Sequence, residues 1–101
     1  MTVVDKCQLV IVDDEPVILG LLESIFSDDD DFIVKACPDG KSAMDAIKQG
    51  VDVLLTDKNL PDIGGLELLK YAKSLHSHVE GIIITGYASL DTVLAAIELD
   101  A

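Results

Sequence analysis

Short apolar runs alternate with amphipathic stretches along the chain. Continuous apolar runs predict four strands, at residues 8–12, 32–36, 51–56 and 80–85. Between these runs, apolar residues recur at helical spacing. The first helix begins at Pro16, which suits a first helical turn, and Gln49-Gly50 closes the second. A third helix follows Gly64-Gly65, and a fourth amphipathic stretch predicts a helix that continues to the C-terminus.

The alternation of strands and helices predicts the fold class. Each crossover helix lies on the sheet, so the pattern indicates an α/β fold with a doubly wound parallel sheet between two helical layers. The uninterrupted apolar runs at residues 9–12 and 82–84 support strands that are buried on both faces. No linker or low-complexity segment divides the chain, and 101 residues suffice for one domain.

Acidic residues follow two of the predicted strands. Asp13 and Asp14 come after the first strand, and Asp57 comes after the third. Open parallel sheets bind ligands at the carboxyl ends of their strands, where the strand order reverses. If the first and third strands are neighbours, these carboxylates meet in one crevice.

Such a crevice predicts a metal-assisted phosphoryl acceptor. Clustered carboxylates repel one another unless a cation intervenes, and Mg²⁺ prefers oxygen ligands while leaving positions open for a phosphate. Thr85, at the end of the fourth strand, offers a hydroxyl to a bound phosphoryl oxygen. Each residue also has an ordinary structural interpretation. Asp13 and Asp14 suit a helix cap and first turn, Asp57 suits a turn, and Thr85 suits the end of a strand.

Composition narrows the function further. The formal charge is −12, with nineteen acidic residues against seven basic ones, which argues against direct nucleic-acid binding. No apolar run approaches the roughly 20 residues of a membrane span, and the N-terminus does not resemble a signal peptide, so we expect a cytoplasmic protein. The acidic run at residues 28–31 predicts a solvated loop. Cys7 and Cys37 are expected about 16 Å apart, beyond disulfide reach.

Four motifs, in this order and spacing, resemble those of bacterial response-regulator receiver domains. They lie at residues 12–15 (VDDE), 56–61 (TDKNLP), 64–69 (GGLELL) and 85–88 (TGYA). The resemblance covers essentially the whole chain, as a single receiver domain over residues 1–101. It implies a flavodoxin-like sheet with strand order 2-1-3-4.

The resemblance also implies residue roles. Asp57 would accept a phosphoryl group from a histidine kinase or phosphotransfer protein. Asp14 would bind Mg²⁺ directly and Asp13 largely through water, and Asp57 and the backbone carbonyl of Asn59 would be further ligands. Thr85 would move toward the phosphoryl group and alter a partner-binding surface, and Ala88 would leave room for the donor.

The chain departs from the family pattern at its C-terminal end. The family's fifth strand, with its lysine, and its fifth helix are absent from these 101 residues. We therefore expect a C-terminally shortened domain whose fourth strand becomes an uncovered edge. Lys58 does not replace the missing lysine, because adjacent strand side chains point to opposite faces.

The sequence thus predicts a phosphoacceptor receiver of a two-component system, which is a signalling switch and not an enzyme. An output domain or a receiver homodimer are further possible partners. The alternative is a phosphorylation-independent pseudo-receiver that acts as an interaction module. A haloacid-dehalogenase-like phosphatase is disfavoured, because Asn59 lies where that family has a second aspartate.

Overall fold

The computed structural model of the chain describes residues 6–84. Four strands alternate with three helices, in the order β1 (Cys7–Val12), α1 (Pro16–Ser27), β2 (Phe32–Cys37), α2 (Gly40–Gln49), β3 (Val53–Asp57), α3 (Gly65–Leu75) and β4 (Glu80–Ile84). These elements confirm the predicted alternation. The predicted fourth helix lies outside the described residues.

The third strand differs most from its predicted bounds, because it begins at Val53 and not at residue 51. Asp52, just before the strand, still bonds to both neighbouring strands: its amide donates to the carbonyl of Gln8 in β1, and its carbonyl accepts from the amide of Glu80 in β4. Val51 is buried, with an exposed fraction of 2%, although it lies before the strand. The predicted strand therefore began too early, because a buried apolar residue outside the strand resembles a strand residue in the sequence.

The strands form one parallel sheet in the order β2-β1-β3-β4. β1 lies between β2 and β3, with Leu9 opposite Val34 on one side and Val53 on the other. The expected flavodoxin-like order is thus confirmed. It also brings the carboxyl ends of β1 and β3 side by side, as the candidate crevice requires.

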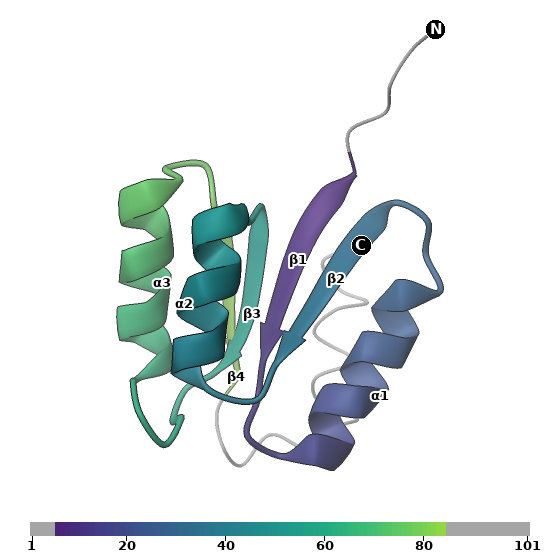
Figure 1. Cartoon of the computed structure of the whole chain (residues 1–101), viewed down its shortest axis with the longest axis horizontal. Helices are drawn as coiled ribbons and strands as arrows, with labels where there is room; N and C mark the ends of the chain where they lie inside the picture. Colours follow the sequence, from purple (N-terminus) through teal and green to yellow (C-terminus); the bar gives the residue numbers. More distant parts are fainter. Residues whose placement is uncertain (1–5, 85–101) are drawn as a thin grey trace, which may run out of the picture.

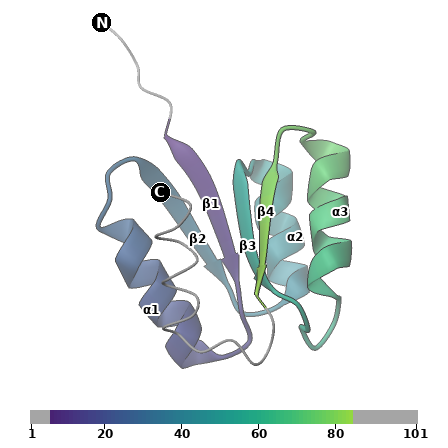
Figure 2. The same cartoon turned by 180° about the vertical axis from the view of Figure 1, so that it is seen from behind.

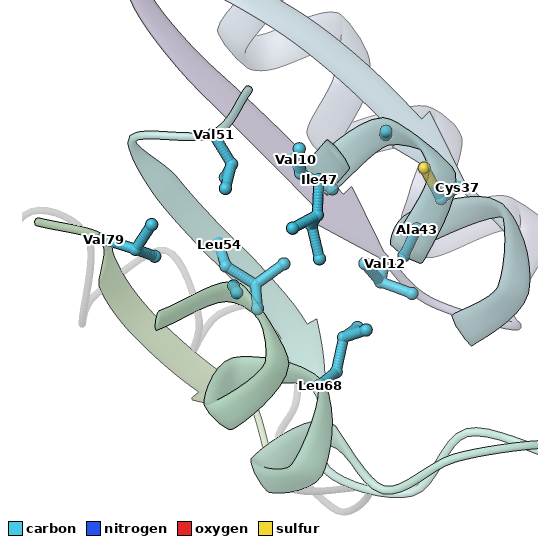
Figure 3. Packing of buried hydrophobic residues seen from close by; sticks show 11 residues of the cluster. Val10, Val12, Cys37, Ala43, Ile47, Val51, Leu54, Leu68 and Val79 are labelled. Carbon is cyan, nitrogen blue, oxygen red and sulfur yellow. The ribbon is translucent and has the colours of Figure 1, made fainter. Parts of the chain in front are cut away.

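Helices cover both faces of the sheet. α2 and α3 lie together on one face, and α1 lies on the other, over β1 and β2 (Figure 1, Figure 2). The larger apolar cluster joins the sheet to α2 and α3, through Val10, Val12 and Leu54 on the strands and Ile47 and Leu68 on the helices (Figure 3). This arrangement is the three-layer architecture that the sequence predicts.

Alternate residues of the central strands supply the two apolar clusters. Val10 and Val12 of β1 pack toward α2 and α3, whereas Leu9 and Ile11 pack in the second cluster with Leu22 of α1. The side chains of Val10 and Ile11 are both completely buried. Burial on both faces explains the continuous apolar run of this strand.

Two smaller expectations concern the cysteines and the acidic loop. Cys7 and Cys37 are both free thiols, at opposite ends of their paired strands. Residues 28–31 are exposed, and the Asp29 side chain accepts a hydrogen bond from the amide of Asp31. Within the described part of the chain, no helix has the length and apolar character needed to cross a membrane.

Candidate functional site

The first acidic residues lie immediately beyond β1. Asp13 is almost fully buried, with an exposed fraction of 4%, whereas Asp14 is exposed. The amide of Asp13 donates to the carbonyl of Cys37 at 3.2 Å, and its Oδ1 accepts the amide of Glu15 at 2.8 Å. These bonds fix the carboxylate at the turn that leads into α1.

Asp57 is the last residue of β3 and is half-buried. It pairs with Ile84 of β4, and the next amide, that of Lys58, donates to the Ile84 carbonyl at 2.7 Å. The start of α3 closes tightly over this position, because a Cβ at Gly65 would collide with the backbone carbonyl of Asp57. The backbone of Asp57 is thus held on two sides.

The fold brings the predicted acidic residues together. One carboxylate oxygen from each of Asp13, Asp14 and Asp57 lies within 4.8 Å of the other two. Among the described residues, this is the one group of three or more acidic, histidine or cysteine side chains close enough to share a metal ion. Three hard oxygen donors at such distances fit a divalent cation such as Mg²⁺.

Within this cluster, the ionised form of Asp13 is disfavoured when no cation is bound. Burial raises the pKa of the Asp13 carboxyl above its ordinary value. The hydrogen bond from the Glu15 amide opposes this shift, and repulsion from Asp57, Asp14 and Glu15 adds to it. Within residues 6–84, no lysine forms an ion pair with these carboxylates. A bound cation would therefore relieve repulsion that the described side chains leave in place.

Comparison with known proteins identifies the family. The family model described as "Response regulator receiver domain" matches residues 9–101. The chain belongs to the response regulator receiver domain family. The cluster of Asp13, Asp14 and Asp57 thus lies in a receiver domain, at the carboxyl ends of β1 and β3.

Curated relatives agree with this assignment. The receiver domain is 37% identical over 92 residues to response regulator protein PilR of Pseudomonas aeruginosa, covering 90% of this chain and 20% of PilR. It is 33% identical over 95 residues to sporulation initiation phosphotransferase F of Bacillus subtilis, covering 93% of this chain and 76% of that protein. The chain thus spans about one fifth of the length of PilR but most of the length of the phosphotransferase.

Solved structures support the fold. A CheY-like response regulator receiver domain protein from Methanospirillum hungatei superposes with a TM-score of 0.74 at 29% identity, covering 95% of this chain and 77% of that one. The agreement extends the family assignment from motifs to the arrangement of strands and helices.

Two predicted site residues require separate comment. Asn59 lies in the loop after β3, where its amide approaches Asp57 Oδ1 at 3.4 Å and its backbone bridges to Gly64. Its role as a carbonyl ligand stays a prediction. Thr85 lies outside the described residues of the receiver domain, as does Ala88, so their roles also stay predictions.

The sequence did not predict the contacts of two residues near the site, Gly65 and Asp62. Gly64-Gly65 predicted a loop, but Gly65 begins α3 and allows the close approach to Asp57. Asp62 was part of an unassigned loop, yet its carboxylate accepts hydrogen bonds from the amides of Gly40 and Lys41. The partners of Asp62 lie 22 and 21 residues away, so no local pattern could indicate them.

Proposed function

We propose that this receiver domain is the phosphoacceptor module of a cytoplasmic two-component signalling system, with Asp57 as acceptor and Mg²⁺ as cofactor. The observation that carries the proposal is the convergence of the Asp13, Asp14 and Asp57 carboxylates within 4.8 Å in a member of the receiver family. The domain is a signalling switch and not an enzyme in the usual sense.

Asp57 is assigned as the acceptor from its place in the motif at residues 56–61. Its half-buried position at the end of β3, with its backbone held on two sides, supports this role. One of its carboxylate oxygens attacks the phosphorus of a phosphohistidine on the donor. The new O–P bond forms as the N–P bond breaks, and the electron pair stays on the imidazole nitrogen, which is then protonated. When bound, Mg²⁺ would neutralise negative charge on the transferring oxygens.

Asp14 would bind the cation directly from its exposed position, and Asp13 would bind it largely through water from its buried one. Asp57 and the backbone carbonyl of Asn59 would be further ligands. Each of these groups supplies oxygen, in keeping with the preference of Mg²⁺. The hydrogen bond from the Glu15 amide keeps Asp13 oriented toward the cluster.

Thr85 senses the phosphorylated state. The added phosphoryl group brings negative charge and strong acceptor oxygens, toward which the Thr85 hydroxyl moves. That movement changes the surface presented to a partner, such as an output domain or a second receiver.

The phosphoryl donor is a sensor histidine kinase or a phosphotransfer protein. An exposed apolar stripe on α1 supports docking of such a protein beside the site: Val17, Leu21 and Ile25 share one helix face, and Val17 is 79% exposed. The stripe begins four residues after Asp13. A protein bound there lies next to the carboxylate cluster.

Intact-mass measurement tests the proposal. The chain is incubated with Mg²⁺ and a small acyl-phosphate donor, beside Asp57→Asn and a matched control, Asp45→Asn, at an exposed position on α2. We expect one phosphoryl adduct on the chain and on the control, none on Asp57→Asn, and none after chelation of Mg²⁺. A folded chain that forms no adduct would contradict the proposal and favour the phosphorylation-independent pseudo-receiver.

A further inference from the structure

The loop between β3 and α3 is fastened to the start of α2 by one side chain. Asp62 Oδ1 accepts the amide of Gly40 at 2.9 Å, and Asp62 Oδ2 accepts the amide of Lys41 at 2.9 Å. The first amides of a helix have no partner within the helix and carry its positive dipole end. A carboxylate with two acceptor oxygens therefore suits both amides at once.

Packing at Gly40 supports the same contact. Gly40 is buried, and a Cβ there would collide with Ile63 Cγ2 and lie 2.9 Å from Asp62 Oδ1. The loop can approach this closely because residue 40 has no side chain. Hydrogen bonding and close packing thus both hold the tip of the loop against α2.

The other end of the loop is tied to the acidic site. Asn59 forms an antiparallel bridge with Gly64, and the amide of Gly65 donates to the carbonyl of Lys58 at 2.8 Å. Asn59 therefore lies in a closed loop, with Asp57 at its base and the Asp62 contact at its tip.

The segment before α2 also reaches the opposite side of the site. The carbonyl of Cys37 accepts the amide of Asp13, and Asp39 caps α2 by accepting the amide of Ser42 at 2.8 Å. Residues 37–41 therefore contact the β1 end of the site through Cys37 and the β3 loop through Asp62. Asp62 closes this connection between the two sides of the carboxylate cluster.

We propose that Asp62 is a positioning residue, which fixes the loop carrying Asn59 relative to Asp13 and Asp57 through the start of α2. This role rests on the proposed Mg²⁺-dependent phosphoryl transfer, in which the Asn59 carbonyl is a ligand. Asp62 itself touches neither the cation nor the phosphoryl group. Its effect is on how well the site is formed before the cation binds.

The test compares Asp62→Ala, Asp62→Asn and the control Asp45→Ala, which removes the same charge from an exposed position on α2. Mg²⁺ affinity is measured from backbone amide shifts at Asp13 and Asp57, and phosphorylation from intact mass. We expect Asp62→Ala to weaken Mg²⁺ affinity about tenfold, within the range seen when groups supporting metal ligands are removed. Asp62→Asn, which keeps one acceptor oxygen, should fall between Asp62→Ala and the unsubstituted chain.

The dependence on Mg²⁺ separates positioning from general destabilisation. Raising Mg²⁺ should restore the phosphorylation rate of Asp62→Ala, because the substitution affects the formation of the site and not the acceptor. If Asp62→Ala does not fold, the Mg²⁺ affinity of Asp62→Asn tests the positioning role in its place. An Mg²⁺ affinity for Asp62→Asn equal to that of Asp45→Ala would then overturn the proposal.

The experiment also distinguishes two kinds of failure. If the unsubstituted chain binds Mg²⁺ but forms no adduct, the proposed function fails, while the affinities of the Asp62 variants still decide the positioning role. If the chain forms the adduct and the Asp62 variants match Asp45→Ala in affinity, only the positioning role fails. If the folded chain does not bind Mg²⁺, both are overturned.

Discussion

The two ends of the sheet hold aspartates in opposite environments. At the amino end, Asp52 Oδ2 accepts the amide of Gln8 and Oδ1 pairs with His78 Nε2, both at 2.8 Å. The hydrogen bond from Gln8, followed by that from His78, lowers the pKa of Asp52. At the carboxyl end, burial and neighbouring carboxylates raise the pKa of Asp13. Both carboxylate oxygens of Asp52 thus have partners at the amino end, whereas three carboxylates lie close together at the carboxyl end.

This difference agrees with a structural role for Asp52 at the amino end and with the proposed functional site at the carboxyl end. Asp52 joins the starts of β1 and β3 through its side chain and backbone, and Asp52 is thus a structural aspartate. Burial and neighbouring carboxylates disfavour the ionised form of Asp13, so its ionisation should cost folding free energy when no cation is bound. A perturbed carboxylate at one end of the sheet, opposite a hydrogen-bonded one at the other, agrees with the proposed site at the carboxyl end.

The largest expected effect concerns backbone packing at the carboxyl end. Gly65→Ala should destabilise the fold by about 2–3 kcal/mol, because the added Cβ collides with the rigid backbone carbonyl of Asp57. It should also abolish phosphorylation by displacing Asp57. Chemical denaturation and intact mass measure the two effects.

Gly20→Ala is the matched control for this substitution. A Cβ at Gly20, within α1, has no neighbouring atom within 4 Å. The same change should therefore stabilise the fold by about 0.5–1 kcal/mol through helix propensity. Equal effects of the two substitutions would refute the close approach between α3 and Asp57.

The amino end is tested next by Asp52→Ala. Removal of this carboxylate leaves the Gln8 amide and His78 without their acceptor, which should cost about 1–1.5 kcal/mol. Phosphorylation of Asp57 should be unchanged. Denaturation of Asp52→Ala beside Asp45→Ala measures this cost, and a loss of phosphorylation would show that the two ends are not independent.

At the carboxyl end, Asp13→Asn should raise the free energy of unfolding in the absence of divalent cations, whereas Asp52→Ala lowers it. Asn keeps an acceptor for the Glu15 amide but removes repulsion with Asp57 and Asp14. Unit charges about 4 Å apart repel by about 1 kcal/mol even in water, so the gain in stability should be of that order. A destabilised Asp13→Asn without cations would contradict the electrostatic part of the comparison.

The smallest effect is a difference in pH dependence. The lowered folded pKa of Asp52 gives stability that is present above its unfolded pKa and lost as pH falls through the folded value. The raised folded pKa of Asp13 gives a penalty that grows as pH rises from the unfolded value through the folded one.

Unfolding free energies from about pH 3 to about pH 7 test these signs. The difference between the unsubstituted chain and Asp52→Asn should shrink on acidification. The difference between Asp13→Asn and the unsubstituted chain should also shrink on acidification, but with the variant as the more stable protein. If Asp52→Asn and Asp13→Asn both raised, or both lowered, the free energy of unfolding at neutral pH, the distinction between the two ends would be lost.

Much of the fold follows from local sequence patterns. The strands and helices within residues 6–84 could be predicted because burial on both faces requires apolar runs such as residues 9–12, and helices require the 3.6-residue period. The strand order came from the family resemblance. Periodicity alone could not supply it, because it does not specify which strands are neighbours.

The site was partly predictable for the same reason. Asp13, Asp14 and Asp57 follow strands directly, so the parallel sheet brings them together. The contacts of Asp52 with Gln8 and of Asp62 with Gly40 span 44 and 22 residues. Only the assembled sheet and helices bring these groups into contact, and no local pattern indicates the pairing.

The effect of Mg²⁺ on unfolding tests the central claim most directly. A concentration ten times the dissociation constant should stabilise the unsubstituted chain by about 1.4 kcal/mol. Asp52→Asn should gain the same amount, because its substitution lies at the opposite end of the sheet, whereas Asp13→Asn should gain much less. If Asp13→Asn gains as much from Mg²⁺ as the unsubstituted chain, the carboxylate cluster is not the cation site and the account is contradicted.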